Sequence, residues 1–124
     1  MKQKNALIFE DDPHVLEIYE IVLEGLGFQV HTSMTSHDVL EKAEEFSPDL
    51  IIMDNWIPDI GGVRATQLLK QHGTFGRIPV IYVSANTEVE SLSKMAMADA
   101  FLAKPFSLDE LECKILSFIS DPRV

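Results

Sequence analysis

With 124 residues, of which 46% are hydrophobic and 24% charged, the chain has the composition of one globular domain spanning residues 1–124, which excludes disordered and fibrous classes. Acidic residues outnumber basic ones by 20 to 10, and the net charge of −10 disfavours direct contact with nucleic acid or anionic lipid. Apolar runs are all shorter than the roughly 20 residues of a membrane span, and the single cysteine, Cys113, cannot form an internal disulfide, so we expect a cytoplasmic protein without membrane contacts.

Short apolar runs alternate with stretches of helical periodicity, which is typical of successive βα units. Residues 6–9 predict the first strand, and Asp12-Pro13 supplies an N-cap and a first-turn proline for a helix that runs to about Leu26. We expect one buried stripe on this helix, formed by Val15, Ile18, Tyr19, Val22 and Leu26. Residues 28–32 alternate and predict a strand near an edge of the sheet.

The middle of the chain contains the clearest strand. Before it, Thr35, Ser36 and Asp38 resemble a capping box for a helix that ends at Ser47-Pro48. Residues 50–53 are wholly apolar and end on Asp54, as expected for a central strand covered on both faces. Gly61-Gly62 then precedes a helix that ends near residue 72.

The last third predicts two more strands, at residues 79–83 and 101–103, and two more helices. The helix at residues 88–97 ends near Met97. Met95 and Met97 either fill the core, which is the more common case, or form part of an adaptable partner surface. Ser107 and Glu110 form a capping box for the last helix. We expect its buried face to contain Leu108, Leu111, Ile115 and Phe118. The predicted fold is α/β, a flavodoxin-like doubly wound sheet of five parallel strands in the order 2-1-3-4-5, flanked by five helices.

Polar residues follow the carboxyl ends of four predicted strands. They are Glu10 and Asp11, Asp54, Ser84, and Lys104. Ligands of doubly wound sheets bind beyond these ends where the strand order reverses, and here that point lies between the first and third strands. The three carboxylates should therefore meet in one pocket. Two unit charges about 4 Å apart repel by roughly 4 kcal/mol at an effective dielectric near 20, so the cluster must bind protons or a hard cation.

Magnesium fits this cluster best, because carboxylates, waters and a substrate phosphate are its usual ligands and zinc would need histidines or cysteines. Beside the metal, Asp54 can act as a nucleophile toward a phosphoryl group whose charge Lys104 and the Ser84 hydroxyl also stabilise. The product would be an acyl phosphate. A single aspartate at a strand end is more often a helix cap or a solvated turn residue. Here, however, five polar residues follow successive strand ends, which favours a functional site.

Four segments of the chain together resemble the receiver domain of two-component response regulators. They are residues 6–13 (ALIFEDDP), 48–54 (PDLIIMD), 79–85 (PVIYVSA) and 101–106 (FLAKPF). Each segment alone is a weak signal, but the ordered set is specific and covers nearly the whole chain. The chain departs from the family at Gly61-Gly62, where Asp-Gly is common, and at Met97, where glycine is usual and a left-handed C-cap would be strained in a non-glycine residue.

The resemblance implies that Asp54 accepts a phosphoryl group from a histidine kinase or phosphotransfer protein. It also implies that Asp11 and Asp54 bind Mg²⁺ directly, that Glu10 binds it through water, and that Trp56 offers its backbone carbonyl. Ser84 and Phe101 take the positions of the family's switch residues, and the Lys104-Pro105 peptide is expected to be cis. Such a domain phosphorylates and dephosphorylates itself and is not a conventional enzyme. It acts on a downstream target or output domain, and a homodimer is one option for the phosphorylated state.

Two other functions fit the same fold. A metal-dependent phosphohydrolase with an aspartyl-phosphate intermediate would need an acid/base two residues after the nucleophile, where this chain has Trp56, which cannot act as one. A flavin-binding electron carrier would need a phosphate-binding Gly/Ser/Thr loop after the first strand, where this chain has carboxylates.

The resemblance also suggests that the lifetime of the phosphorylated state depends on the residues at positions 56 and 86. Trp56 could shield the acyl phosphate from water but cannot accept a proton, and Asn86 orients water only weakly. We therefore expect a long-lived phosphorylated state. The alternative is that the side chain of Trp56 points to solvent and that only its carbonyl matters.

Overall fold

Five parallel strands form one sheet in the order β2-β1-β3-β4-β5. The computed structural model describes residues 4–119. The strands are β1 (Lys4–Phe9), β2 (Phe28–Ser33), β3 (Leu50–Asp54), β4 (Val80–Ser84) and β5 (Ala100–Ala103). The order confirms the predicted doubly wound topology, with residues 28–33 at an edge of the sheet and the order reversing between β1 and β3.

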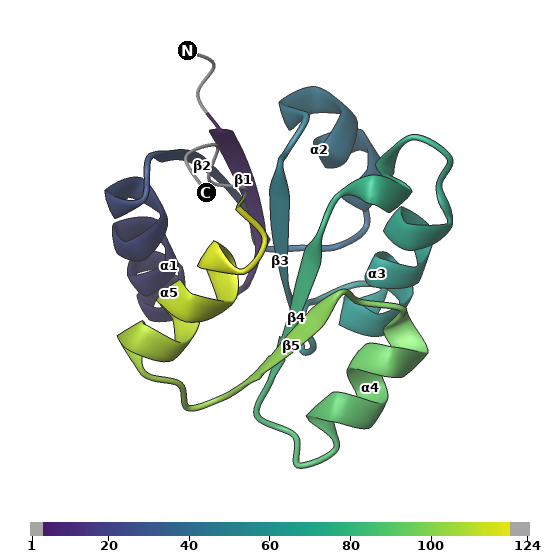
Figure 1. Cartoon of the computed structure of the whole chain (residues 1–124). Coiled ribbons are helices and arrows are strands. Elements are labelled where there is room, and N and C mark those ends of the chain that lie inside the picture. Colours follow the sequence, from purple (N-terminus) through teal and green to yellow (C-terminus); the bar gives the residue numbers. More distant parts are fainter. Residues whose placement is uncertain (1–3, 120–124) are drawn as a thin grey trace.

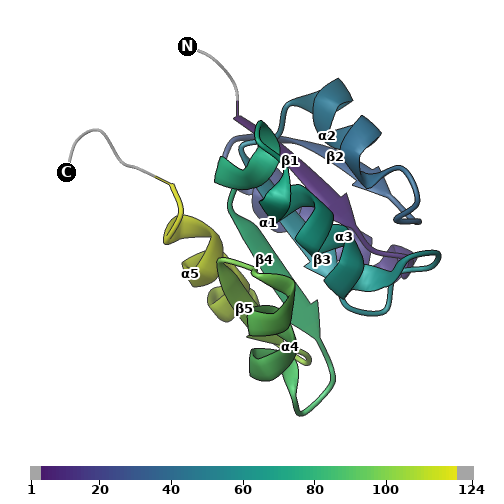
Figure 2. The ribbon, with the colours of Figure 1, turned by 90° about the vertical axis from the view of Figure 1, so that its right-hand side faces the viewer.

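Helices cover both faces of this sheet (Figure 1). They are α1 (Pro13–Gly25), α2 (Val39–Phe46), α3 (Gly61–Gln71), α4 (Val89–Ala96) and α5 (Leu108–Leu116), with a short 3₁₀ helix, η1 (Phe75–Arg77), after α3. Figure 2 shows α2, α3 and α4 on the viewer's side of the sheet. The helices α1 and α5 pack together on the opposite face (Figure 1). Within residues 4–119, each helix is too short or too polar to cross a membrane.

Alternate residues of the inner strands enter two separate cores. Ile8 and Ile52 pack against α1 and α5, whereas Leu7 and Ile51 pack against α2 and α3. Every residue of β3 and β4 is buried. Because both faces of these strands are covered, their sequences are continuous apolar runs, which is why the strands could be predicted from the sequence.

The predicted helix caps are confirmed at two of three positions. Asp12 caps α1 by accepting a hydrogen bond from the His14 amide at 2.9 Å. At α5, the Ser107 hydroxyl accepts from the Glu110 amide at 3.0 Å, and the Glu110 carboxylate accepts from the Ser107 amide at 2.9 Å. The capping box predicted before α2 is wrong, because Asp38 makes no side-chain cap bond and the hydroxyl of Ser36 binds the loop after β3 instead.

Two predicted buried stripes are partly wrong. The residues of α1 that are buried are Leu16, Tyr19 and Leu23. Ile18 is 37% exposed, because the buried face is centred on Tyr19 and the apolar residues of α1 cover a wider arc than the core accepts. In α5, Leu111 and Ile115 are buried as predicted, but Leu108 is 57% exposed at the first position of the helix.

The end of α4 also differs from expectation. Met97 has a left-handed backbone with a φ of 68°, so the chain does place a non-glycine residue in the expected C-cap conformation. The prediction that Met95 and Met97 fill the core is wrong, since their exposed fractions are 59% and 44%. The left-handed turn at Met97 leaves its side chain outside the cluster that Tyr82, Val89 and Ala96 form.

Gly62, near the start of α3, allows that helix to approach the carboxyl end of β3. A Cβ at this position would lie 2.4 Å from the carbonyl oxygen of Asp54 and 2.8 Å from the Cα of Asn55.

We predict that Gly62→Ala lowers the free energy of unfolding by about 1–3 kcal/mol, measured by urea denaturation, because the helix must move away. The control is Gly73→Ala, where no heavy atom lies within 4 Å of the added Cβ. Equal stabilities of the two variants would contradict this account of Gly62.

Candidate functional site

The carboxyl ends of four strands bring the predicted site residues to one edge of the sheet. Glu10 and Asp11 follow β1, Asp54 and Ser84 end β3 and β4, and Lys104 follows β5. Because β1 pairs with β3 in parallel register, the carboxylates after these strands are neighbours. One carboxylate oxygen from each of Glu10, Asp11 and Asp54 lies within 4.8 Å of the other two. The structure thus confirms the predicted three-carboxylate pocket.

Two of these three acids are removed from solvent. Glu10 is 1% exposed and Asp54 is 4% exposed, whereas Asp11 is more accessible. Burial raises the pKa of Glu10 from 4.5 to about 7, and repulsion from Asp54 adds to this effect while Lys104 opposes it. Glu10 therefore takes up a proton more readily than an ordinary glutamate when no metal ion shares the pocket.

Lys104 supplies the positive charge that faces this cluster. Its Nζ lies 2.8 Å from Oδ1 of Asp54 and 3.2 Å from Oε1 of Glu10. Burial lowers the pKa of Lys104, but the hydrogen bond and the charge of Asp54, with a further contribution from Glu10, outweigh it and raise the pKa above its ordinary value. The lysine is held in its charged form. One ammonium against three carboxylates still leaves the pocket negative.

The donor atoms of the pocket are of the kind that hard cations prefer. They are carboxylate oxygens on three side chains that approach from two neighbouring strands, and Asp11 keeps access to solvent. Mg²⁺ is held in proteins by a few carboxylates together with several waters, rather than by a full cage of protein ligands. These residues therefore fit a magnesium ion, which would also relieve the charge imbalance.

Backbone contacts hold the Asp54 carboxylate in place. Its Oδ2 accepts a hydrogen bond from the amide of Trp56 at 2.9 Å, while its Oδ1 faces Lys104. The Asn55 amide donates to the Val83 carbonyl at 2.8 Å, which extends the pairing of β3 with β4 by one residue. Each oxygen of the Asp54 carboxylate therefore has one partner that fixes its position, and the carboxylate faces the pocket.

The remaining predicted residues occupy different surroundings. Ser84 is 3% exposed, and its hydroxyl accepts a hydrogen bond from the Asn86 amide at 3.0 Å. Phe101 is half-buried on β5, next to Tyr82 of β4 in the strand register. Trp56 is 83% exposed, so its side chain packs against little of the chain. This exposure gives no support to the prediction that Trp56 shields the acyl phosphate from water.

One contact of the site was not predicted from the sequence. The hydroxyl of Tyr82 donates a hydrogen bond to Oδ1 of Asn55, the residue after Asp54. Burial raises the pKa of Tyr82 to about 12, and the charge of Asp54 adds to the effect. The polar Asn55 directly after an apolar strand was the available signal, but its partner lies 27 residues away and only the fold brings it close.

Comparison with known proteins defines the class to which this fold and site belong. Residues 6–116 match the family described as the response regulator receiver domain, so the chain belongs to that family. A curated relative is the polar-differentiation response regulator DivK of Brucella ovis, which is 28% identical over 120 residues that cover 95% of this chain and 98% of DivK.

Solved structures agree with this assignment. The CheY-like response regulator receiver domain from Methylobacillus flagellatus is 28% identical, with a TM-score of 0.81 over 95% of this chain and 100% of that one. The receiver domain of the sensor histidine kinase PA1611 from Pseudomonas aeruginosa is 27% identical, with a TM-score of 0.84 over 94% of this chain and 98% of that one. That structure is described with a magnesium ion coordinated in its active-site cleft.

The contacts of Lys104 lead to a prediction about stability. We expect Lys104→Met to lower the free energy of unfolding by about 2–3 kcal/mol in metal-free buffer near pH 7, because it leaves buried carboxylates without a partner. Chemical denaturation measures the change. The matched control is Lys94→Met, which removes an exposed ion pair with Glu90 at 3.7 Å and should change stability by about 0.5 kcal/mol or less. A loss at Lys104 no larger than that at Lys94 would contradict the proposed balance of charges.

Proposed function

We propose that Asp54 of this receiver domain accepts a phosphoryl group from a histidine kinase or phosphotransfer protein in a Mg²⁺-dependent reaction. The observation that carries the proposal is the cluster of Glu10, Asp11 and Asp54, with Glu10 and Asp54 buried and Lys104 in contact with Asp54 at 2.8 Å. Asp11 and Asp54 would hold the ion directly, with Glu10 acting through water and Trp56 through its backbone carbonyl. The structure of the PA1611 receiver domain, described with magnesium in its active-site cleft, supports this arrangement by analogy.

In the proposed reaction, the Asp54 carboxylate is the nucleophile in a phosphoryl transfer. One of its oxygens attacks the phosphorus of a phosphohistidine, the phosphorus–nitrogen bond breaks, and the imidazole leaves with the electron pair. A Mg²⁺ ion held by these carboxylates would neutralise charge on the phosphoryl oxygens. Lys104 contributes a second positive charge, already placed against Asp54. The product is an acyl phosphate on Asp54.

Ser84 is the residue we expect to respond to this new group. Its hydroxyl oxygen accepts a hydrogen bond from the Asn86 amide, which leaves its own proton free to donate to a phosphoryl oxygen. A move of Ser84 would displace the end of β4, and Phe101 lies on the neighbouring strand β5, opposite Tyr82, two residues before Ser84. We propose that these two residues pass the change to a partner-binding surface, which makes the domain a signalling module rather than a conventional enzyme.

The alternative of a phosphohydrolase finds no support in this site. Such an enzyme would need a general acid or base two residues after its nucleophile, and that position is Trp56, whose indole has only an N–H donor. Its side chain is also 83% exposed.

Phosphorylation of Asp54 can be tested with a small-molecule donor. We predict that the wild-type chain gains one phosphoryl mass when incubated with acetyl phosphate and Mg²⁺, and that Asp54→Asn gains none, measured by intact-protein mass spectrometry. The control variant is Asp49→Asn, which changes an exposed aspartate before β3 in the same way. Labelling of Asp54→Asn at the wild-type rate would refute the assignment.

Binding of Mg²⁺ should stabilise the folded chain, because the pocket forms only in the folded state. At a free Mg²⁺ concentration about tenfold above the dissociation constant, the stabilisation is about 1.4 kcal/mol and is seen as a higher melting temperature. We predict that Asp11→Asn removes most of this shift. Asp12→Asn is the matched control, since Asp12 caps α1 through its side chain and asparagine caps a helix equally well. An equal shift in both variants would count against Asp11 as a ligand.

A further inference from the structure

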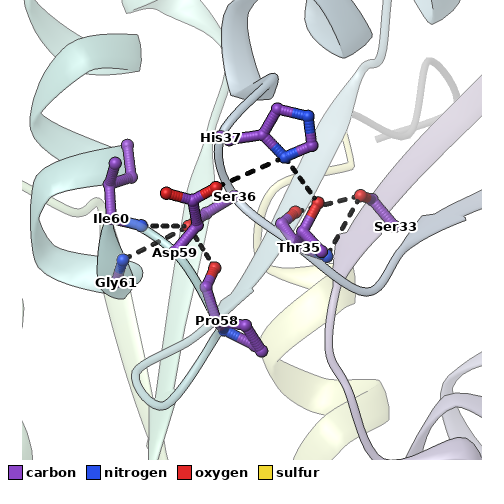
Figure 3. Close-up of polar contacts among 8 residues, drawn as sticks. All are labelled: Ser33, Thr35, Ser36, His37, Pro58, Asp59, Ile60 and Gly61. Atoms are coloured by element: carbon purple, nitrogen blue, oxygen red, sulfur yellow. Dashed lines mark hydrogen bonds and ion pairs between the residues drawn. The ribbon is translucent and has the colours of Figure 1, made fainter.

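Ser36 joins two loops at the edge of the site (Figure 3). It lies between β2 and α2 and has no exposed surface. Its hydroxyl donates to the carbonyl of Pro58 at 2.7 Å and accepts from the amides of Ile60 and Gly61 at 3.0 and 3.2 Å. The amide of Ser36 also donates to the Pro58 carbonyl, at 3.1 Å. One buried side chain thus binds three backbone groups of the loop between β3 and α3.

That loop has a conformation that needs such partners. Asp59 and Gly61 have φ angles of 87° and 83°, in the left-handed region that glycine tolerates and an aspartate adopts at a cost. The turn points the amides of residues 60 and 61 toward Ser36 (Figure 3). Without the hydroxyl, both amides would lose their acceptor, so the loop would shift to satisfy them.

The same loop carries Trp56, whose carbonyl we assign to the metal site. Its amide is fixed to Oδ2 of Asp54 at 2.9 Å, two residues before it, and Pro58, two residues after it, is fixed to Ser36. Trp56 therefore lies midway between two fixed points. We expect a change at either point to alter the direction of its carbonyl.

We propose that Ser36 is a positioning residue for the metal site: its hydroxyl holds the loop after β3 so that the Trp56 carbonyl faces the same pocket as Asp54. The inference rests on the proposed function, because it concerns the Mg²⁺ that this function requires. Ser36 does not itself touch the carboxylates, and its effect on the ion passes through the backbone of residues 56–58.

A second contact joins the two loops but is weaker. Nδ1 of His37 lies 3.5 Å from Oδ2 of Asp59 and 3.0 Å from the hydroxyl of Thr35 (Figure 3). The side chains of His37 and Asp59 are 60% and 49% exposed, and ion pairs this exposed contribute little. Backbone bonds from the Ser36 amide to the Pro58 carbonyl and from the Gly62 amide to the Asn55 carbonyl, each at 3.1 Å, also hold the loop. Of the side-chain contacts between the two loops, the buried hydroxyl of Ser36 is the one we expect to matter most.

Ser36→Ala tests the proposal through two measurements on the whole chain. We expect the Mg²⁺ dissociation constant, measured by titration calorimetry, to rise by about three- to tenfold, because two amides lose their acceptor and the carbonyl of Trp56 is released. We also expect faster hydrogen exchange at the amides of Ile60 and Gly61, with unchanged exchange at Ile51 and Ile52 in β3. A purely structural role would lower the melting temperature and leave the Mg²⁺ affinity of the folded chain unchanged.

The matched control is Ser33→Ala, in the same segment. Among residues 4–119, the hydroxyl of Ser33 forms hydrogen bonds only with the backbone of Thr35, donating to its carbonyl at 2.9 Å and accepting from its amide at 3.4 Å (Figure 3). This variant should therefore bind Mg²⁺ as the wild type does. His37→Ala should also bind it with the wild-type affinity.

Each outcome decides one of the two proposals. Wild-type affinity in Ser36→Ala, or the same loss in Ser33→Ala, overturns the role of Ser36 and leaves the metal site intact. Failure of the wild-type chain to bind Mg²⁺ overturns the proposed function itself. If Ser36→Ala does not fold, the measurement moves to Ser36→Cys, which places a weaker donor and acceptor at the same point. That variant must bind Mg²⁺ more weakly than the wild type, and equal affinity overturns the proposal.

Discussion

The contact of the Lys104 ammonium with Asp54 and Glu10 is the interaction on which the site depends. Asp54 and Glu10 are almost fully buried, so their carboxylates repel each other and lose their hydration. Both effects favour protonation of one carboxylate or separation of the two. The lysine at 2.8 and 3.2 Å keeps them together in the folded chain. It compensates only part of the negative charge, so the pocket stays ready to accept a divalent cation.

The topology of the sheet makes this contact possible, because it brings the ends of the strands together. Parallel strands end at the same edge, and in doubly wound sheets the binding crevice lies where the strand order reverses, which here is between β1 and β3. The loops around that edge are then set by backbone contacts. Gly62 lets α3 approach the carbonyl of Asp54, and Ser36 fixes the far end of the same loop. The residues at the strand ends supply the charged groups of the site, and these loop contacts set the positions of the backbone around them.

Sequence reasoning found the parts of this arrangement that depend on local patterns. The inner strands were predictable because burial on both faces requires continuous apolar runs, and Asp54 and Lys104 were predictable because each directly follows such a run. The helix faces were harder, since apolar residues such as Ile18 and Leu108 fit a stripe by spacing but lie outside the core. The roles of Ser36 and Tyr82 could not be predicted, because their partners lie 22 to 27 residues away in loops whose shape no local pattern determines.

The central claim is that Asp54 itself carries the phosphoryl group, and chemical trapping tests it most directly. Borohydride reduces an acyl phosphate to an alcohol, so it converts a phosphorylated aspartate to homoserine and marks the position. After treatment with acetyl phosphate and Mg²⁺ and then with borohydride, peptide mass spectrometry should find homoserine at position 54 and aspartate at position 11. A reduced side chain at another carboxylate of the pocket, or none in the chain despite a gain of phosphoryl mass, would contradict the account.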